Sequence, residues 1–247
     1  MTKEIKNYWE YNSKYYQEDS NIKIGIHYGP GAPFENQLKL LGNLKGKRII
    51  EIGCGGAQCG IAMAKQGAIV TGIDQSKEQL KLAKTLAEKN KVKIKLIQGS
   101  FQDLSKFQSN SFDIAFSAFA FQYSPNLKKL FKQVYRILRK KGLFVFSLDH
   151  PFFDVINPKT LKVQRSYLET GRYTDKNKRG PDFVGYRHSI QELFTPLVEA
   201  GFVVEKIIEP DSRKKYLGDP WYGLWNMYVP RIMNLVPPTI ILGARKT

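Results

Sequence analysis

The chain has 247 residues, of which 42% are hydrophobic and 25% are charged, a composition that excludes a disordered or fibrous protein. The 39 lysines and arginines outnumber the 22 acidic residues, so the formal net charge is +17. The apolar runs are shorter than the ~20 residues of a spanning helix, and the first residues contain no apolar secretory segment. These features predict a cytoplasmic protein without a membrane span.

Short apolar runs alternate with helical patterns along the middle of the chain. Five runs predict buried strands, at 48–53, 68–74, 93–99, 112–119 and 143–148. The segments between them predict helices at 57–66, 76–90 and 126–141. A last helix is expected at 189–200, before strands at 202–208 and 239–244. This alternation predicts an α/β fold with a mostly parallel, doubly wound sheet.

Three less regular pieces accompany this core, and long irregular segments in compact domains tend to carry function. We expect an N-terminal aromatic helix around Tyr8–Tyr16 and a lid formed by this helix and an insertion after the fifth strand. We therefore predict a single domain over 1–247, divided into an N-terminal lid element (1–45), a ligand-binding core (46–148), a lid insertion (149–188) and the C-terminal part of the core (189–247).

The strongest motif ends the first predicted strand and opens a helix, with the sequence Glu51-Ile-Gly-Cys-Gly-Gly56. Glycines at such a turn let the backbone approach a ligand, and the following helix offers unpaired N–H groups. Asp74 stands at the tip of the second strand, where a carboxylate can accept hydrogen bonds from both ribose hydroxyls. The pattern indicates a cofactor that contains a nucleoside.

Two other nucleotide sites fit this motif less well. A nicotinamide fingerprint that starts at Gly53 requires a third glycine at position 58, which is Gln58. No lysine followed by serine or threonine continues the motif, so a P-loop is also excluded. A nicotinamide dehydrogenase is therefore the least favoured interpretation of this motif.

The segments 49–56 and 67–74 resemble the first two cofactor motifs of class I S-adenosylmethionine-dependent methyltransferases, most closely the small-molecule branch. The segments 99–104, 111–116 and 138–146 continue the resemblance, which covers roughly residues 43–148. It implies a Rossmann-like fold with seven strands, one of them antiparallel. It also implies S-adenosyl-L-methionine as cofactor and S-adenosyl-L-homocysteine as product.

The resemblance assigns the methionine and ribose parts of the cofactor to the first two strands. Glu51 would position the methionine part, and Gly53 and Gly55 would pass beneath the methionine and ribose. Cys54 belongs to the same cofactor-binding turn, and Asp74 would hold the ribose hydroxyls.

The adenine would be held by the ends of the second and third strands. Gln75 would lie beside the adenine, and Ser100 and Phe101 would meet its edge. Family members commonly have Asp at the position of Ser100, so one adenine contact is weaker here or shifts to Asp103. Ser117, at the end of the fourth strand, would flank the sulfonium.

The acceptor is expected to be small and aromatic or apolar. The fourth strand ends in Ser117-Ala-Phe-Ala-Phe-Gln-Tyr123, without the proline-containing motifs of DNA amino-methylating and cytosine enzymes. We place Tyr16, His27, Tyr28, Phe119, Tyr123 and His188 in the acceptor pocket. Further aromatic side chains of the irregular segments are expected around it, namely Trp9, Tyr15, Phe121, Phe152, Phe153, Tyr167, Tyr173, Tyr186, Trp221, Tyr222 and Trp225.

His150 directly follows the fifth strand and is the candidate general base for a transfer that otherwise needs only in-line positioning. No metal site is expected, because acids and histidines are not spaced as ligands. Two alternatives remain. One is an RNA or ribosome-associated methyltransferase, supported by 15 basic and 5 acidic residues within 126–187. The other is a non-catalytic protein that binds S-adenosylmethionine. The oligomeric state is not predicted.

Overall fold

The computed structural model describes residues 2–20, 22–213 and 228–247. The helices are α1 (Lys3–Ser20), α2 (Glu35–Leu38), α3 (Gln58–Lys65), α4 (Lys77–Lys89), α5 (Leu127–Ile137), α6 (Ile190–Glu199) and α7 (Pro230–Met233). Two 3-10 turns are η1 (Phe121–Tyr123) and η2 (Phe153–Val155). The strands are β1 (Arg48–Ile52), β2 (Ile69–Asp74), β3 (Lys95–Gln98), β4 (Phe112–Ala118), β5 (Leu138–Asp149), β6 (Gly171–Asp175), β7 (Phe183–Arg187), β8 (Phe202–Ile208) and β9 (Thr239–Lys246).

The main sheet has seven strands in the order β3-β2-β1-β4-β5-β9-β8. The pairs from β3 to β5 are parallel, while β9 is antiparallel to both β5 and β8. This topology confirms the predicted Rossmann-like fold with one antiparallel strand. Parallel strands place their carboxyl ends at one edge, where such folds bind ligands.

Both faces of the sheet are buried, as alternating side chains of β1 illustrate. Ile50 and Ile52 pack in a cluster with α5 and α6, whereas Ile49 packs with α3 and the segment before β1. Each of these isoleucines is fully buried. The sheet is thus covered on both sides, and its carboxyl edge is the place left for the irregular segments.

Two predicted helix starts are confirmed by their capping contacts. Ser76 accepts a hydrogen bond from the Gln79 N–H, and Ser189 forms a capping box with Glu192. The predicted helix at 126–141 is too long, because α5 ends at Ile137 and β5 starts at Leu138. Leu138 pairs with Phe112 before the register shifts, so pairing with β4 ends this helix earlier than its own periodicity indicates.

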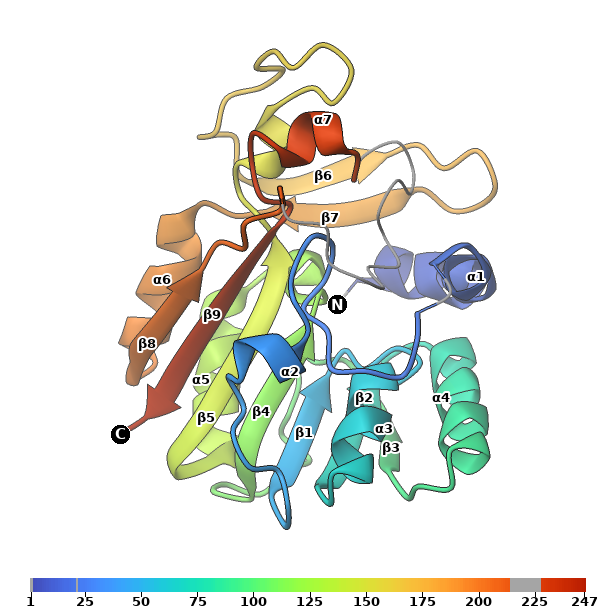
Figure 1. The fold of residues 1–247 in the computed structure, drawn as a ribbon, viewed down its shortest axis with the longest axis vertical. Helices are drawn as coiled ribbons and strands as arrows, with labels where there is room; N and C mark the ends of the chain where they lie inside the picture. The colour runs from blue at the N-terminus through green and yellow to red at the C-terminus, as the bar shows by residue number, and fades with distance from the viewer. Residues whose placement is uncertain (1, 21, 214–227) are drawn as a thin grey trace.

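The N-terminal helix and the segment after β5 both lie over the carboxyl edge (Figure 1). The helix is longer than predicted, and α1 contacts both α4 and β7. The segment 149–188, for which we predicted only an irregular insertion, contains the antiparallel hairpin β6–β7. Trp221, Tyr222 and Trp225 lie outside the described residues. In the described part of the chain, no helix has the length and apolar character needed to cross a membrane.

Candidate functional site

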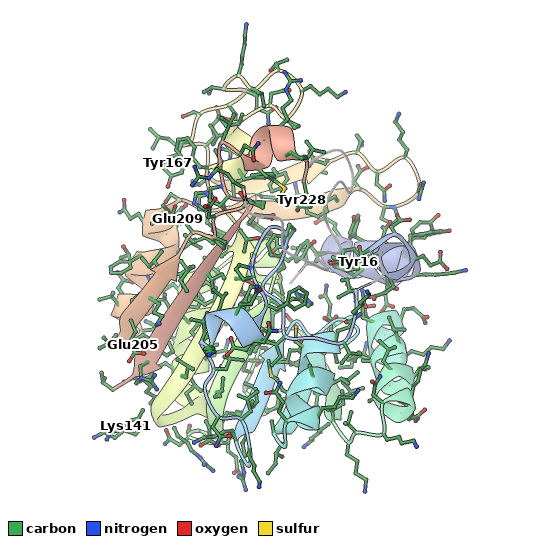
Figure 2. All side chains as sticks on the ribbon, viewed as in Figure 1. Tyr16, Lys141, Tyr167, Glu205, Glu209 and Tyr228 are labelled. Carbon is green, nitrogen blue, oxygen red and sulfur yellow. The ribbon has the colours of Figure 1, made fainter. Side chains whose placement is uncertain are left out.

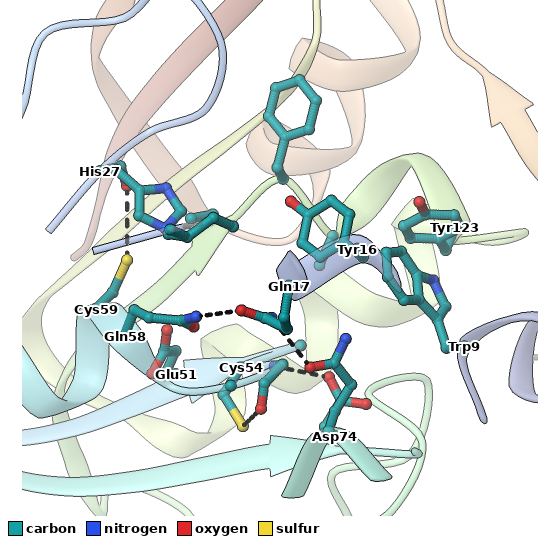
Figure 3. A pocket seen from close by; sticks show the side chains of 18 of the residues that line it. Trp9, Tyr16, Gln17, His27, Glu51, Cys54, Gln58, Cys59, Asp74 and Tyr123 are labelled. Atoms are coloured by element: carbon teal, nitrogen blue, oxygen red, sulfur yellow. Dashed lines mark hydrogen bonds between the residues drawn. The ribbon is translucent and has the colours of Figure 1, made fainter. Parts of the chain in front are cut away.

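Two adjoining cavities lie at the carboxyl edge of the sheet. The first cavity is lined by the loop after β1, the tip of β2 and residues of α1 (Figure 3). Six predicted cofactor residues line it, namely Glu51, Gly53, Cys54, Gly55, Asp74 and Phe101. The second cavity lies between α1, the loop after β4 and the β6–β7 hairpin. Trp9, Tyr16, Phe119 and Tyr123 line both, so ligands in the two cavities would be neighbours.

The turn after β1 requires glycine for its geometry. The N–H groups of Gly53 and Cys54 both donate to the Ile73 carbonyl, at 2.9 and 3.1 Å, and tie the turn to β2. Gly53 has a φ of +71°, and a Cβ there would lie 2.5 Å from the Cβ of Ala120. The turn therefore fits closely against the loop after β4, and its backbone forms one wall of the first cavity.

Asp74 is fixed at the tip of β2 by backbone donors. Its Oδ2 accepts from the Gly55 N–H and its Oδ1 accepts from the Ser76 N–H, both at 2.9 Å. Burial raises the pKa of Asp74, and the backbone hydrogen bonds oppose this shift. Each carboxylate oxygen has a further lone pair, so Asp74 can also accept from ribose hydroxyls. The donor set and the glycine turn thus fit a nucleoside-containing cofactor.

Glu51 lies deeper in the first cavity. Its Oε2 accepts a hydrogen bond from the Gly60 N–H at 2.9 Å, at the start of α3. Burial, with a contribution from the Asp74 charge, raises the pKa of Glu51 to about 8. A cationic group in the cavity would stabilise the ionised form of Glu51 and so lower this pKa.

Three glutamines of this cavity were not predicted as site residues. Gln58 Nε2 donates to Gln17 Oε1 at 2.7 Å, and Gln17 Nε2 lies 3.4 Å from Gln79 Oε1 (Figure 3). Trp9 of α1 lines the cavity beside them. Gln17 and Gln58 are 41 residues apart in sequence. No local pattern joins them, because the contact depends on where α1 docks.

The remaining predicted cofactor residues are near the first cavity but do not line it. Ser117 donates its hydroxyl to the Ile52 carbonyl at 2.8 Å, which ties β4 to β1. Gln75 follows Asp74 and is buried, and its carbonyl accepts a hydrogen bond from the Gln98 side chain. Ser100 accepts a hydrogen bond from the Gln102 N–H. Their roles toward a cofactor stay predictions.

The second cavity has a volume of about 550 Å³, within the range typical of small-molecule sites. Figure 2 labels Tyr16 and Tyr228 in this region, and Lys141 and Glu205 at the opposite end of the sheet. Aromatic side chains form about half of the lining, namely Tyr8, Trp9, Tyr15, Tyr16, Phe119, Tyr123, Tyr173, Phe183 and Tyr228. Most of the other lining residues are polar or charged, namely Asn12, Asp19, Gln122, Asp149, Asp175, Lys176, Asn177, Lys178 and Arg179.

Two of the polar side chains that line the second cavity, Asp149 and Gln122, have unusual surroundings. Asp149, at the end of β5, is held by burial and by the Asp154 charge at a pKa of about 7. Gln122 donates its amide to the Phe119 carbonyl at 2.9 Å, while its Oε1 has no partner in the described structure. We did not predict either residue as part of the site. A residue at the carboxyl end of a parallel strand is the signal that could have identified Asp149.

The predicted acceptor residues divide into two groups. Tyr16, Phe119 and Tyr123 line both cavities, and His27 lines the first. Tyr28 is fully buried and donates its hydroxyl to Glu35. His188 is not among the residues that line the two cavities, and burial lowers its pKa.

Both ring nitrogens of His150, the predicted general base, have hydrogen-bond partners in the structure. Its Nε2 lies 2.7 Å from Glu209 Oε1, and its Nδ1 accepts a hydrogen bond from the Phe152 N–H at 3.1 Å. His150 is absent from the lining of both described cavities. Both ring nitrogens are therefore engaged by neighbouring groups of the fold.

All arginines of the basic segment 126–187 have partners within the fold. Arg139 pairs with Asp113, and Arg136 donates to the Leu104 and Phe107 carbonyls. The other arginines of this segment form salt bridges with acidic residues. Arg165 and Arg187 both pair with Asp154. Arg172 pairs with Glu4, and Arg179 pairs with Asp19. The segment's guanidinium groups are thus used to join elements of the fold.

No group of three or more histidine, cysteine, aspartate or glutamate side chains within the described ranges is arranged to hold a metal ion.

Comparisons with known proteins find similarity to methyltransferases. Residues 50–146 match the family model described as methyltransferase domain. The chain is 28% identical over 181 residues to the uncharacterised methyltransferase YbaJ of Bacillus subtilis, a match that covers 67% of this chain and 69% of YbaJ. It is 26% identical over 165 residues to the ubiquinone biosynthesis O-methyltransferase of Vibrio campbellii, covering 67% of this chain and 65% of that protein.

A solved structure supports the fold over most of the chain. The S-adenosylmethionine-dependent methyltransferase from Mesorhizobium loti superposes with a TM-score of 0.66 at 23% identity. The alignment covers 85% of this chain and 96% of that one.

Proposed function

Because the chain belongs to the class I S-adenosylmethionine-dependent methyltransferase superfamily, we propose that it methylates a small aromatic or apolar acceptor bound in the second cavity. The observation that carries this proposal is the pair of adjoining cavities with a shared aromatic wall of Trp9, Tyr16, Phe119 and Tyr123. Rings at that boundary suit a flat acceptor, and their faces attract a nearby cation.

S-adenosylmethionine supplies an electrophilic methyl group attached to a positively charged sulfur. In this proposal Asp74 accepts hydrogen bonds from the ribose hydroxyls, and the turn at Gly53 and Gly55 lets the backbone approach the methionine part. Phe101, which lines the first cavity, meets the adenine edge in this proposal. Glu51, buried nearby, stabilises positive charge in the first cavity. The chain's main contribution to the reaction is then to align the acceptor with the methyl group.

Oxygen is a chemically reasonable atom for methylation. The relative from Vibrio campbellii is named as an O-methyltransferase, which supports oxygen as the methylated atom.

The two alternatives have less support in the structure. Every arginine of 126–187 has a partner within the fold, so the phosphates of an RNA would be left to the lysines of this segment. A protein that only binds the cofactor needs no acceptor pocket, yet a cavity of about 550 Å³ adjoins the first cavity.

Calorimetric titration with S-adenosylhomocysteine tests the cofactor assignment. We expect micromolar or tighter binding, weakened at least tenfold in Asp74→Ala, because each hydrogen bond to a charged group contributes roughly 1.5–3 kcal/mol. Glu88→Ala, which removes an exposed acid from α4, is the control and should bind like the wild type. Binding of NADH instead of S-adenosylhomocysteine by folded protein would overturn the proposal.

A further inference from the structure

Two hydrogen-bond acceptors in the second cavity have no donors in the fold. The Asp149 carboxylate makes no hydrogen bond or ion pair with any described residue. Gln122 is only 5% exposed, and its amide is oriented by the Phe119 carbonyl, which leaves Oε1 without a donor. Gln122 Oε1 is buried, and a buried acceptor without a donor is costly. Its presence in the same cavity as the half-buried, unpaired Asp149 carboxylate points to a ligand that supplies the donors.

The position of Asp149 connects it to the first cavity. The Phe119 N–H donates to the Ser147 carbonyl at 3.0 Å, so the loop after β4 is fixed to the end of β5 two residues before Asp149. Phe119 lines both cavities, and Gln122 lies three residues further along this loop. Asp149 and Gln122 therefore belong to the part of the second cavity that adjoins the first.

Asp149 forms no ion pair with a described residue, although the loop between β6 and β7 brings Lys176, Lys178 and Arg179 to the same cavity. Of these, Lys176 pairs with Asp182 and Arg179 with Asp19. Asp154 lies close enough to raise the pKa of Asp149, but Asp154 is itself paired with Arg165 and Arg187. Burial raises the pKa values of Tyr123 and Tyr173, and the nearby Asp149 charge adds to both shifts, but neither hydroxyl donates a hydrogen bond to Asp149. Arg187 lies over the Tyr173 ring and is already engaged with Asp154.

On the basis of the proposed function, we propose that Asp149 and Gln122 select aromatic acceptors that carry an O–H or N–H group, and that Asp149 receives the proton which this group loses. The acceptor's ring would lie among the aromatic side chains, and its donor would bond to the two unpaired oxygens. As the acceptor oxygen or nitrogen forms its bond to the methyl carbon, sulfur keeps the electron pair of the bond that breaks. The released proton binds to an Asp149 oxygen, so the sulfonium and carboxylate charges are both neutralised.

Matched ligands test the selection directly. We would titrate wild-type protein, saturated with S-adenosylhomocysteine, with catechol and with 1,2-dimethoxybenzene, which has the same ring without a donor. Calorimetry and ligand-observed NMR should show that catechol binds at least tenfold more tightly. Asp149→Asn should reduce this preference to about threefold or less, and Gln122→Leu should reduce it by a smaller factor. The affinity for dimethoxybenzene should be similar in all three proteins.

The pH dependence gives a second readout. Catechol binding to the wild type should strengthen between pH 6 and 8, as the Asp149 carboxylate ionises, whereas binding to Asp149→Asn should be flat. If Asp149→Asn does not fold, the matched ligands on the wild type and on Gln122→Leu still decide the proposal.

The results distinguish this inference from the proposed function. Tight S-adenosylhomocysteine binding with equal affinity for the two ring compounds, or with neither bound, overturns the acceptor site alone. An unchanged catechol preference in Asp149→Asn overturns the role of Asp149. Failure of the wild type to bind S-adenosylhomocysteine overturns the proposed function itself.

Discussion

Gln58 Nε2 donates a 2.7 Å hydrogen bond to Gln17 Oε1 and joins the N-terminal helix to the first turn of α3, beside the cavity that both residues line. A second polar contact of α1 lies nearby, where the Glu10 carboxylate accepts hydrogen bonds from the N–H groups of Lys77 and Glu78 at the start of α4. The helix α1 is therefore attached through polar contacts to the half of the sheet that holds the first cavity. Its docking closes this cavity on one side.

We predict that Gln17→Ala releases S-adenosylhomocysteine faster than the wild type. The lost hydrogen bond is neutral and worth roughly 0.5–1.5 kcal/mol, which corresponds to an increase in the dissociation rate of about two- to tenfold. Stopped-flow displacement measures this rate. Lys14→Ala, an exposed change on the same helix, is the control. An unchanged or slower dissociation rate for Gln17→Ala would show that the hydrogen bond between Gln17 and Gln58 does not retain the ligand.

We predict that Gly53→Ala is far more destabilising than Gly46→Ala. The two glycines have φ values of +71° and +74°, so alanine has the same backbone strain at both positions. A Cβ at Gly46 meets nothing within 4 Å, whereas a Cβ at Gly53 would lie 2.5 Å from the Ala120 Cβ. Gly46→Ala should cost about 1 kcal/mol in unfolding free energy. Gly53→Ala should cost more unfolding free energy and should also weaken S-adenosylhomocysteine binding. Urea titrations measure the unfolding free energies of both variants. Equal losses of unfolding free energy would contradict the close fit between Gly53 and Ala120.

We predict that Asp149→Asn stabilises the protein at high pH. The pKa of Asp149 is about 7 in the fold against an ordinary value of 3.8. Between these values the unfolded chain loses its proton first, so the free energy of unfolding falls as pH rises through this range. Asn cannot ionise, so Asp149→Asn should have a higher Tm than the wild type at pH 8 and the same Tm near pH 4. At this chain length, each kcal/mol of unfolding free energy that the substitution restores corresponds to an increase in Tm of about 2–4 °C.

Asp182→Asn is the control for this measurement. Its partner Lys176 lowers the pKa of Asp182, so its charge favours the fold, and the substitution should give no gain in Tm at pH 8. A Tm difference for Asp149→Asn that is independent of pH would rule out ionisation as the cause.

We predict that His150→Ala lowers stability and leaves the affinity for S-adenosylhomocysteine unchanged. The substitution removes a partner from both Glu209 and the Phe152 N–H, at a cost of roughly 1–3 kcal/mol. Thermal unfolding and calorimetry measure the two quantities. Unchanged stability together with an altered pH–rate profile would instead restore His150 as the base.

The sheet and the first cavity were predictable because their signals are local. The turn at Gly53 and the acid at Asp74 each stand at the end of a strand, and the parallel topology brings such ends together. The early end of α5 was missed because it is decided by pairing between Leu138 and Phe112, which are distant in sequence.

The second cavity was less predictable because its walls come from segments that meet only in the fold. The aromatic residues Tyr16, Phe119 and Tyr123 were expected in the acceptor pocket and line the second cavity. Asp149 and Gln122, two of its polar groups, were not predicted. His150 has the better intrinsic pKa for a base, but its ring contacts Glu209, while its neighbour Asp149 lines the cavity without a partner.

The place of β9 in the sheet has a consequence for how the chain assembles. This strand is synthesised after all the others, yet it lies between β5 and β8 and bonds to both. The strands from β1 to β5, which carry the glycine turn and Asp74, can pair while later residues are still being added. β8 and its helix α6 have no strand to join until β9 arrives. The order of synthesis thus allows the strands that carry the first cavity to pair before the sheet can be completed.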